Sequence, residues 1–264
     1  MRMNLAGFMK ILFNTLFATK YAVTLRKYTS ILSVFIVGIM SVIPSISHAV
    51  NEKDILNCPQ PKPFSAEYYT PRSLPIRGNV KIQLIALKEP NHYYYESKVS
   101  ALWQTQTESS HLVWGPGEFF IKSYYSERKG FGKKKENKII FDQNKKKMTY
   151  YKDDQIVEKE LPSFIVDTLS EQLLVSCLVK KGYTNFEIPT FTKGELAPHS
   201  FKVVKEEKIK TGEGSIATYK VEKIHRSTER TTILWLSKEH PYLIVKIEQN
   251  DNRKKYSILL DKLL

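Results

Sequence analysis

The chain contains 264 residues, with 41 Lys and Arg against 27 Asp and Glu, so its formal net charge is +14. In a cytosolic protein this excess of positive charge would favour nucleic acid as the partner. The first residues predict export, however, and an exported protein would not meet cytosolic nucleic acid. The acidic partners that remain are lipid headgroups, phosphorylated glycans and cell-wall polymers, unless the basic surface serves solubility alone. A length of this order permits one β-rich domain with a sizeable core.

Residues 1–49 have the composition of a secretory signal peptide. They carry five basic residues and no acidic residue, and an apolar run over 28–43 ends before Pro44. The small residues Ser47 and Ala49 then occupy positions −3 and −1 of a cleavage site. We therefore predict cleavage after Ala49 and a periplasmic mature protein. An uncleaved anchor is the alternative, although a run of roughly 16 residues is shorter than the ~20 that span a bilayer.

The mature chain starts with a proline-containing lead-in, 50–63, which we predict to be extended. After it, apolar and polar residues alternate with the period of two that is typical of half-buried strands, most clearly over 80–87. Turn signals such as Gly115-Pro116-Gly117 separate these runs. The strands predicted in this half cover 64–70, 80–87, 93–102, 105–113, 118–126, 138–142, 148–152 and 155–161.

One helix is predicted, from near Pro162 to near Gly182. Its apolar residues recur at helical spacing and define one face. Ser163 or Asp167 suits the start of the helix as a cap, and Lys180 suits its end. The apolar face consists of Leu169, Leu173, Leu174, Cys177 and Leu178.

Alternation resumes after the helix. The predicted strands cover 184–191, 200–210, 215–226, 230–236, 242–249 and 256–260. Because successive strands are close in sequence, hairpin-linked antiparallel pairs are favoured over βαβ units. The predicted fold is mostly β, a single strongly curved antiparallel sheet or open barrel over residues 64–264, with one amphipathic helix packed on it.

The two cysteines, Cys58 and Cys177, both lie in the mature part. In an oxidising compartment they allow one disulfide, which would tie the helix to the lead-in. Closing a loop of this size would stabilise the fold by ~4–5 kcal/mol. Two buried free thiols are the alternative.

Two lysine-rich segments are predicted at hairpin tips. They are Lys133, Lys134 and Lys135 in the first and Lys145, Lys146 and Lys147 in the second. They are candidates for peripheral contact with an anionic membrane or envelope polymer, at roughly 1 kcal/mol per Lys near a charged surface. The alternative is a pair of solvated hairpins whose charges discourage strand pairing at the sheet edge. The intervening strand would place the two tips at its opposite ends.

Adjacent aromatic residues are a second binding signal. They are Tyr93, Tyr94, Tyr95, Phe119, Phe120, Tyr124 and Tyr125. Neighbouring residues of a strand point to opposite faces, so one ring of each group faces the core and another faces solvent or a concave surface. Exposed apolar surface of this kind often marks a ligand site. The alternative is that the helix and the lead-in cover the second face.

No motif indicates catalysis or metal binding. The histidines of the mature chain lack His-x-x-x-His spacing, and none lies at ligand spacing from a cysteine. No Gly-x-Ser-x-Gly elbow is present, and Cys177 lies on a core-facing stripe, which does not suit a reactive thiolate. We therefore expect a protein that is not an enzyme and that has no catalytic residue, no metal and no cofactor. The histidines considered are His92, His111, His199, His225 and His240.

Several segments together resemble a known family. They are LP at 161–162, VDTLS at 166–170, YKVE at 219–222, TILWLS at 232–237 and PYLIVKIE at 241–248. By their order and spacing, the chain resembles over about residues 64–264 the exported bacterial proteins grouped as "domain of unknown function 3108". The resemblance implies a periplasmic location and a β-rich fold related to the open-barrel carriers of lipoproteins. The family has no agreed activity, so no site residue follows from it.

The leading functional hypothesis is an exported, non-catalytic binding module of the cell envelope. The curved sheet would hold an apolar or amphipathic ligand, such as a lipid or an acyl-bearing molecule, between its concave face and the helix. The alternative is an envelope interaction or cell-wall-docking protein with a filled core, which contacts its partner through exposed strands or basic tips.

Overall fold

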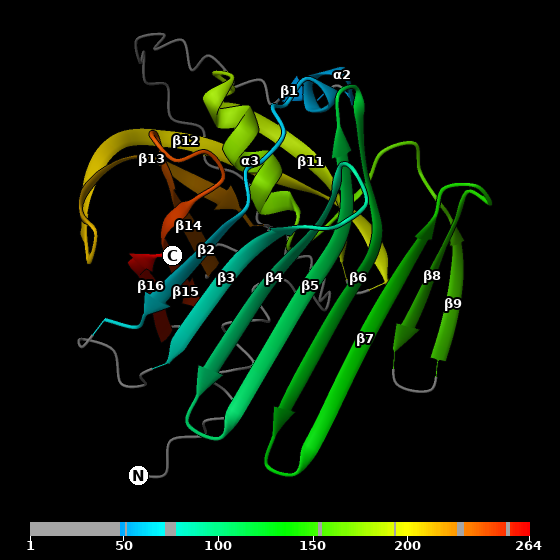
Figure 1. The fold of residues 1–264 in the computed structure, drawn as a ribbon, viewed down its shortest axis with the longest axis horizontal. Helices are drawn as coiled ribbons and strands as arrows, with labels where there is room; N and C mark the ends of the chain where they lie inside the picture. Colours follow the sequence, from blue (N-terminus) through cyan, green and yellow to red (C-terminus); the bar gives the residue numbers. More distant parts are fainter. Residues whose placement is uncertain are drawn as a thin grey trace, which may run out of the picture.

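The computed structural model describes residues 48–50, 52–71, 78–152, 155–192, 194–225, 230–251 and 254–264. Their strands form one 16-stranded sheet, which is antiparallel except where two short strands pair in parallel with a third. The sheet is strongly curved and does not close (Figure 1). The predicted fold class is confirmed.

The strands follow one another as hairpins along most of the chain. The first half contains β1 (His48–Ala49), β2 (Phe64–Tyr69), β3 (Asn79–Ala86), β4 (His92–Ala101), β5 (Gln104–Gly115), β6 (Glu118–Gly130), β7 (Lys133–Asp142), β8 (Lys147–Lys152) and β9 (Gln155–Glu160). The second half contains β10 (Val166–Asp167), β11 (Asn185–Thr192), β12 (Glu195–Thr211), β13 (Gly214–Ile224), β14 (Arg230–Ser237), β15 (Ile244–Asp251) and β16 (Lys254–Leu263). The helices of the described residues are α2 (Glu52–Leu56) and α3 (Glu171–Lys180).

One long-range pairing makes the two halves a single sheet. Strand β16, near the C-terminus, pairs with β2, so the hairpins of the second half continue directly into those of the first. Alternation then decides which side chains face inwards. In β4, for example, Tyr93, Tyr95, Ser97 and Val99 are buried, whereas the residues between them are more exposed. The inward side chains of all the long strands meet in one core.

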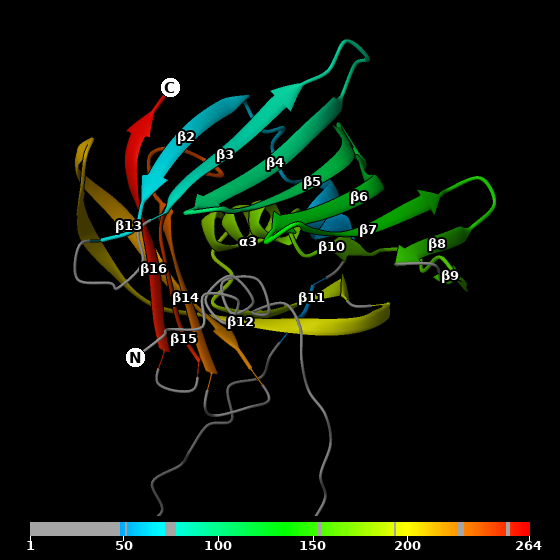
Figure 2. The same ribbon diagram turned by 90° about the horizontal axis from the view of Figure 1, so that it is seen from below.

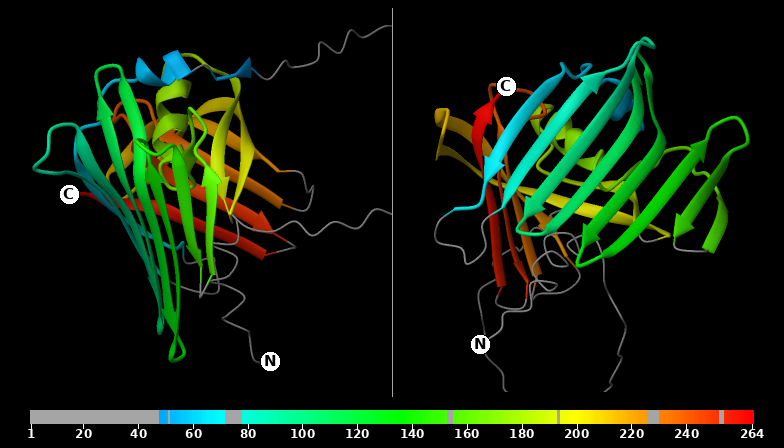
Figure 3. Two further views of the ribbon diagram at one scale, coloured as in Figure 1. Left: turned by 90° about the vertical axis from the view of Figure 1, so that its right-hand side faces the viewer. Right: turned by 60° about the horizontal axis from the view of Figure 1, so that its bottom comes forward.

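Helix α3 lies within the curve of the sheet, between the strands of the first half and those of the second (Figure 2). Residues 173–179 are all buried, including every member of the predicted apolar face that belongs to the helix. The helix is therefore buried more completely than an amphipathic pattern alone indicates. Figure 3 shows from two further directions how the sheet wraps around it, and how the β6–β7 hairpin extends beyond the body of the protein.

The helix begins at Glu171, later than the predicted start near Pro162. The reason lies in Asp167, whose carboxylate accepts hydrogen bonds from the backbone N–H groups of Leu169, at 2.8 Å, and Ser170, at 2.9 Å. These bonds hold a tight turn, and Val166–Asp167 pairs with β11 instead of continuing a helix. The sequence interpretation offered Ser163 or Asp167 as the cap of the helix; Asp167 holds the turn before the helix, and the N-cap position itself is Ser170.

Side chains bridge the gap between the two ends of the sheet. The ring of Phe191, on β11, packs against Phe141 of β7 and Tyr150 of β8, with ring centroids 6.4 and 5.9 Å apart. Lys159 of β9 donates a hydrogen bond to the carbonyl oxygen of Gly194. The interior is thus enclosed on this side without a continuous ladder of backbone hydrogen bonds.

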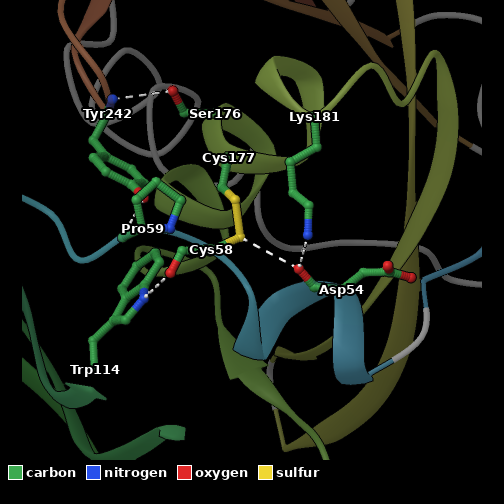
Figure 4. The surroundings of a disulfide bond; sticks show 8 residues. All are labelled: Asp54, Cys58, Pro59, Trp114, Ser176, Cys177, Lys181 and Tyr242. Atoms are coloured by element: carbon green, nitrogen blue, oxygen red, sulfur yellow. Dashed lines mark hydrogen bonds between the residues drawn. A yellow bond between two sulfur atoms is a disulfide. The ribbon is translucent and has the colours of Figure 1, made fainter. Parts of the chain in front are cut away.

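The lead-in differs from its prediction as an extended segment, because Glu52–Leu56 forms the short helix α2. Ile55 is fully buried and anchors α2 to the core, while 57–63 contains neither helix nor strand. The predicted disulfide between Cys58 and Cys177 is present and joins this segment to α3, with the two Cα atoms 5.9 Å apart (Figure 4).

The predicted signal peptide, 1–49, lies outside the described residues except for His48 and Ala49 of β1. Cleavage after Ala49 stays a prediction. Within the described ranges, no helix has both the length and the apolar character needed to cross a membrane.

Candidate ligand-binding cavity

A cavity of about 120 Å³ lies between the start of α3 and the concave face of the sheet. For comparison, an engineered apolar cavity of about 150 Å³ holds benzene. The space therefore suits a small apolar group, not the whole of a long acyl chain. It is lined by Ser97, Glu108, Thr168, Leu169, Glu171, Gln172, Phe201, Lys223, Thr232, Leu234, Ile247, Gln249, Tyr256, Ser257 and Ile258.

The strand register arranges one wall of the cavity in rows across β13 to β16. The first row is apolar and consists of Val221, Leu234, Ile247 and Ile258, which pair in turn. The second row is polar and consists of Lys223, Thr232, Gln249 and Tyr256. A third row lies at the strand ends, where Arg230 pairs with Asp251. The wall therefore changes from apolar to charged towards the rim of the sheet.

A buried ion pair lies where the helix meets this wall. Lys223 Nζ is 2.5 Å from Oε1 of Glu171, and the other carboxylate oxygen accepts hydrogen bonds from Thr190, at 2.9 Å, and from His199. The side chains of Glu171 and Lys223 are only 5% and 8% exposed. Burial alone would raise the pKa of Glu171, but the charges of Lys223 and His199 and the hydrogen bonds lower it to about 2. The carboxyl group of Glu171 is therefore ionised near neutral pH, while burial lowers the pKa of Lys223 against the opposing charge of Glu171.

A second carboxyl group, that of Glu108 on β5, faces the cavity from the opposite side. It is 4% exposed and accepts a 3.1 Å hydrogen bond from Gln106 Nε2. Burial raises its pKa to about 7, and the nearby carboxylate of Asp167 adds to the shift, while the neighbouring hydroxyl group of Tyr124 and the hydrogen bond from Gln106 oppose it. Near neutral pH this group can therefore either donate or accept a hydrogen bond inside the cavity.

The shifted pKa of Glu108 predicts a pH dependence of stability. Because the folded-state pKa of about 7 exceeds the ordinary 4.5, ionisation favours the unfolded chain, so stability is lost as the pH rises from about 4.5 to about 7. Glu108→Gln is expected to remove roughly 2–3 kcal/mol of the difference in unfolding free energy between pH 4.5 and pH 8. Urea unfolding at both pH values measures it. Glu118→Gln, at an exposed position, is the control, and an unchanged pH dependence in Glu108→Gln would contradict the assignment.

Arg230, in the third row, has an incomplete set of partners. Its Nε and Nη2 atoms are buried and have no hydrogen-bond partner among the residues that the structure describes. A buried donor left in this state costs about 1–3 kcal/mol, and such groups normally bind water or another molecule. Burial lowers the pKa of Arg230 to about 10, against the opposing effect of Asp251. The guanidinium is nevertheless charged at neutral pH.

The lysine clusters predicted to contact an anionic surface are not brought together. Lys133, Lys134 and Lys135 begin β7, whereas Lys145 and Lys146 occupy the turn after it and Lys147 begins β8, so the clusters lie at opposite ends of one strand. Acidic neighbours also neutralise part of their charge. The ion pairs are Lys134 with Glu127 and Glu136, Lys145 with Asp142, and Lys147 with Glu158.

The adjacent aromatic residues that were predicted to mark a ligand site do not line the cavity. Tyr93, Tyr95 and Tyr124 are buried in the core, while their neighbours Tyr94 and Tyr125 are half-buried on the other face of the sheet. None of these five residues lines the cavity. The rings predicted to face solvent therefore lie on the convex side, away from the helix.

The sequence interpretation missed the charged residues of the site. His199 was interpreted as an ordinary surface residue, and Glu108, Lys223 and Arg230 were not singled out. A signal was available in β13 and β14, because Lys223 and Arg230 are in phase with the apolar inward residues of their strands. Within the described ranges, no group of three or more His, Cys, Asp or Glu side chains is arranged to hold a metal ion.

Comparison with solved structures supports the fold. The crystal structure of a beta-barrel-like protein of domain of unknown function DUF1849 from Brucella abortus has a TM-score of 0.51 and 10% identity, and the match covers 76% of this chain and 96% of that one. A protein from Parabacteroides distasonis ATCC 8503, provisionally described as a lipoprotein, has a TM-score of 0.30 and 13% identity, with 78% and 97% covered. At these identities the first match shows the fold alone, and the second is too distant to support an argument.

Comparison with sequences identifies the family. No curated protein matches the chain. The family described as "Protein of unknown function (DUF3108)" matches residues 87–252, which is more than half of the chain and includes all five segments on which the resemblance depends. The chain therefore belongs to the DUF3108 family.

Proposed function

We propose that this protein is an exported, non-catalytic binding module of the cell envelope, and that it holds a small amphipathic ligand between helix α3 and strands β13 to β16. The observation that carries the proposal is the graded wall of the cavity. Along strands β13 to β16 an apolar row is followed by a polar row and then by the charged pair of residues at the strand ends, which matches a molecule with one apolar and one polar end.

Export is supported by two features. The basic and apolar segments before Ala49 have the order of a signal peptide. The disulfide between Cys58 and Cys177 requires an oxidising compartment to persist, and the periplasm is one. These features favour a ligand or partner of the envelope over a cytosolic one.

The alternative of a protein-interaction module with a filled core also has support. Helix α3 fills most of the concave space, and the remaining cavity is too small for a long acyl chain. All six residues of the terminal strand β9 are exposed, as a docking edge would require, but Glu158, Lys159 and Glu160 make that edge charged, which disfavours strand addition. The graded cavity therefore favours ligand binding.

Binding of a neutral six-carbon alcohol tests the proposed function. The protein, purified after export, is expected to bind 1-hexanol with a Kd of about 1 mM, the affinity that burial of such a chain provides. Leu234→Phe places a ring in the cavity and is expected to weaken binding at least tenfold in NMR titrations. Val204→Phe adds a ring on the exposed face of β12 and is the matched control. Absence of binding to the wild type, or equal binding to Leu234→Phe, would contradict the proposal.

A further inference from the structure

We propose that the ligand carries an oxyanion, a carboxylate or a phosphate, and that Arg230 receives it at the rim of the cavity. This inference rests on the proposed binding function and specifies the chemistry of the ligand's polar end. It assigns a role to a guanidinium that the fold buries without satisfying.

The position of Arg230 follows from the strand register. It begins β14 two residues before Thr232, which lines the cavity, so the two side chains point to the same side of the sheet. Its cross-strand neighbour Asp251 lies two residues beyond Gln249, another lining residue. Arg230 therefore belongs to the row directly outside the cavity, at the end where a polar headgroup would emerge.

The geometry of the free donors specifies the acceptor. The Nε and Nη2 groups form one edge of the planar guanidinium, and their N–H bonds are parallel. Both atoms of this edge are buried and lack a hydrogen-bond partner in the described part of the chain. Two parallel donors match the two oxygens of a carboxylate or a phosphate, which bind such an edge as a bidentate pair. A hydroxyl group or an amine does not match it.

The charges around Arg230 also favour an anion. Burial lowers the pKa of His225 to about 3, and the positive charges of Arg230 and Lys223 add to the effect. The Nε2 atom of His225 is 2.9 Å from Oγ1 of Thr232, so this ring connects Arg230's surroundings with the cavity. Within the described ranges no carboxylate forms an ion pair with Arg230, and Lys223 is already paired with Glu171. The carboxylate of Asp251 acts on Arg230 from the neighbouring strand, and a bound oxyanion would add a direct partner for the guanidinium.

The three rows then accommodate one amphiphile. An apolar group of about five or six carbons would occupy the cavity against Leu234, Ile247 and Ile258, since a cavity of about 150 Å³ holds benzene. The polar row would surround the junction between the two parts of the ligand. The oxyanion would lie at Arg230, in the row next to the polar one.

The first test compares headgroups on one chain. Hexanoate, hexyl phosphate, 1-hexanol and hexylammonium are titrated into the wild-type protein purified after export, and affinities are measured by NMR. At least one of the two acids is expected to bind roughly 10–100-fold more tightly than 1-hexanol, as charged bidentate hydrogen bonds provide. The order of hexanoate and hexyl phosphate identifies which oxyanion the site prefers.

The second test removes the donors. Arg230→Gln is expected to abolish the preference for acids, so that the acids bind no more tightly than 1-hexanol does. Arg230→Lys keeps the charge but loses the parallel donors, so it is expected to lose most of the preference. Lys220→Gln, on the outer face of β13, removes one positive charge elsewhere and serves as the control.

The outcomes separate this inference from the proposed function. Equal binding of the acids and 1-hexanol, tighter binding of hexylammonium, or an unchanged preference in Arg230→Gln would overturn the role of Arg230 while leaving the cavity as a binding site. Failure of all four molecules to bind would overturn the binding function itself. The comparison of headgroups uses only the wild type and therefore holds even if a variant does not fold.

Discussion

The Cys58→Ser/Cys177→Ser variant is expected to unfold with a free energy about 5 kcal/mol lower than that of the wild type. The disulfide joins residues 119 apart in sequence, and closing a loop of this length restricts the unfolded chain by about that amount. Native domains are stable by only 5–15 kcal/mol in total, so the loss is a large fraction.

The surroundings of the disulfide explain why its removal would also loosen neighbouring elements (Figure 4). Trp114 of β5 donates a 3.3 Å hydrogen bond to the carbonyl oxygen of Cys58, and Lys181 donates one of 2.7 Å to that of Asp54. Tyr242 donates to the carbonyl oxygen of Pro59. These bonds depend on the position of the segment that Cys58 holds, so the end of α3 and the edge of β5 would loosen together.

Urea unfolding monitored by tryptophan fluorescence measures this prediction. The wild type in reducing buffer is the internal control, because it should unfold at the same urea concentration as the double variant. If intact wild-type protein, unfolded without reductant, shows two reactive thiols, the predicted pairing is wrong.

Lys223→Met is expected to cost about 3–5 kcal/mol of stability. The substitution leaves the carboxylate of Glu171 buried with only His199 and Thr190 as partners, and an unpaired buried charge is strongly destabilising. Removing both charges in Glu171→Gln/Lys223→Met should recover most of the loss, because an apolar replacement of a buried pair is often tolerated. Lys202→Met, at an exposed position on β12, is the control.

The same ion pair predicts an acid transition. The pKa of Glu171 is lowered to about 2 in the folded protein, so the stability contributed by its ionised form is complete above about pH 4.5 and is lost as the pH falls towards 2. Glu108 is largely protonated below pH 4.5, so Glu171 can be tested there: between pH 4.5 and pH 3 the unfolding free energy should decline more in the wild type than in Glu171→Gln/Lys223→Met. Equal declines in the two proteins would show that Glu171 does not contribute to the transition.

The strands were predictable because local alternation and turn chemistry agree with the final fold. The pattern over 80–87, for example, reports a half-buried strand regardless of its partners, and β3 occupies Asn79–Ala86. The apolar spacing from Leu169 to Leu178 likewise indicates a helix that packs on the core. The start of the helix was misplaced because the turn at Asp167 depends on β11 and on Ser110, which lies on β5 and donates a 2.8 Å hydrogen bond to that carboxylate.

The binding site was not predictable in the same way. Glu108, Glu171, Lys223 and Arg230 come from β5, α3, β13 and β14, and a polar residue in an alternating strand is ordinarily assigned to solvent. Only the curvature of the sheet brings these side chains to the same interior. The lysine clusters attracted attention in the sequence because they are contiguous there, and the tertiary structure places them at opposite ends of β7.

By itself, the sequence determined the β-rich fold class, the helix that packs on the core and the family, because these depend on periodicity or on short segments of the chain. The disulfide was predictable because two cysteines allow only one pairing. The tertiary structure alone decided the rest. The pairing of β16 with β2 joins strands far apart in sequence into one curved sheet. That pairing and the curvature decide which polar side chains are enclosed beneath α3 and which remain in water.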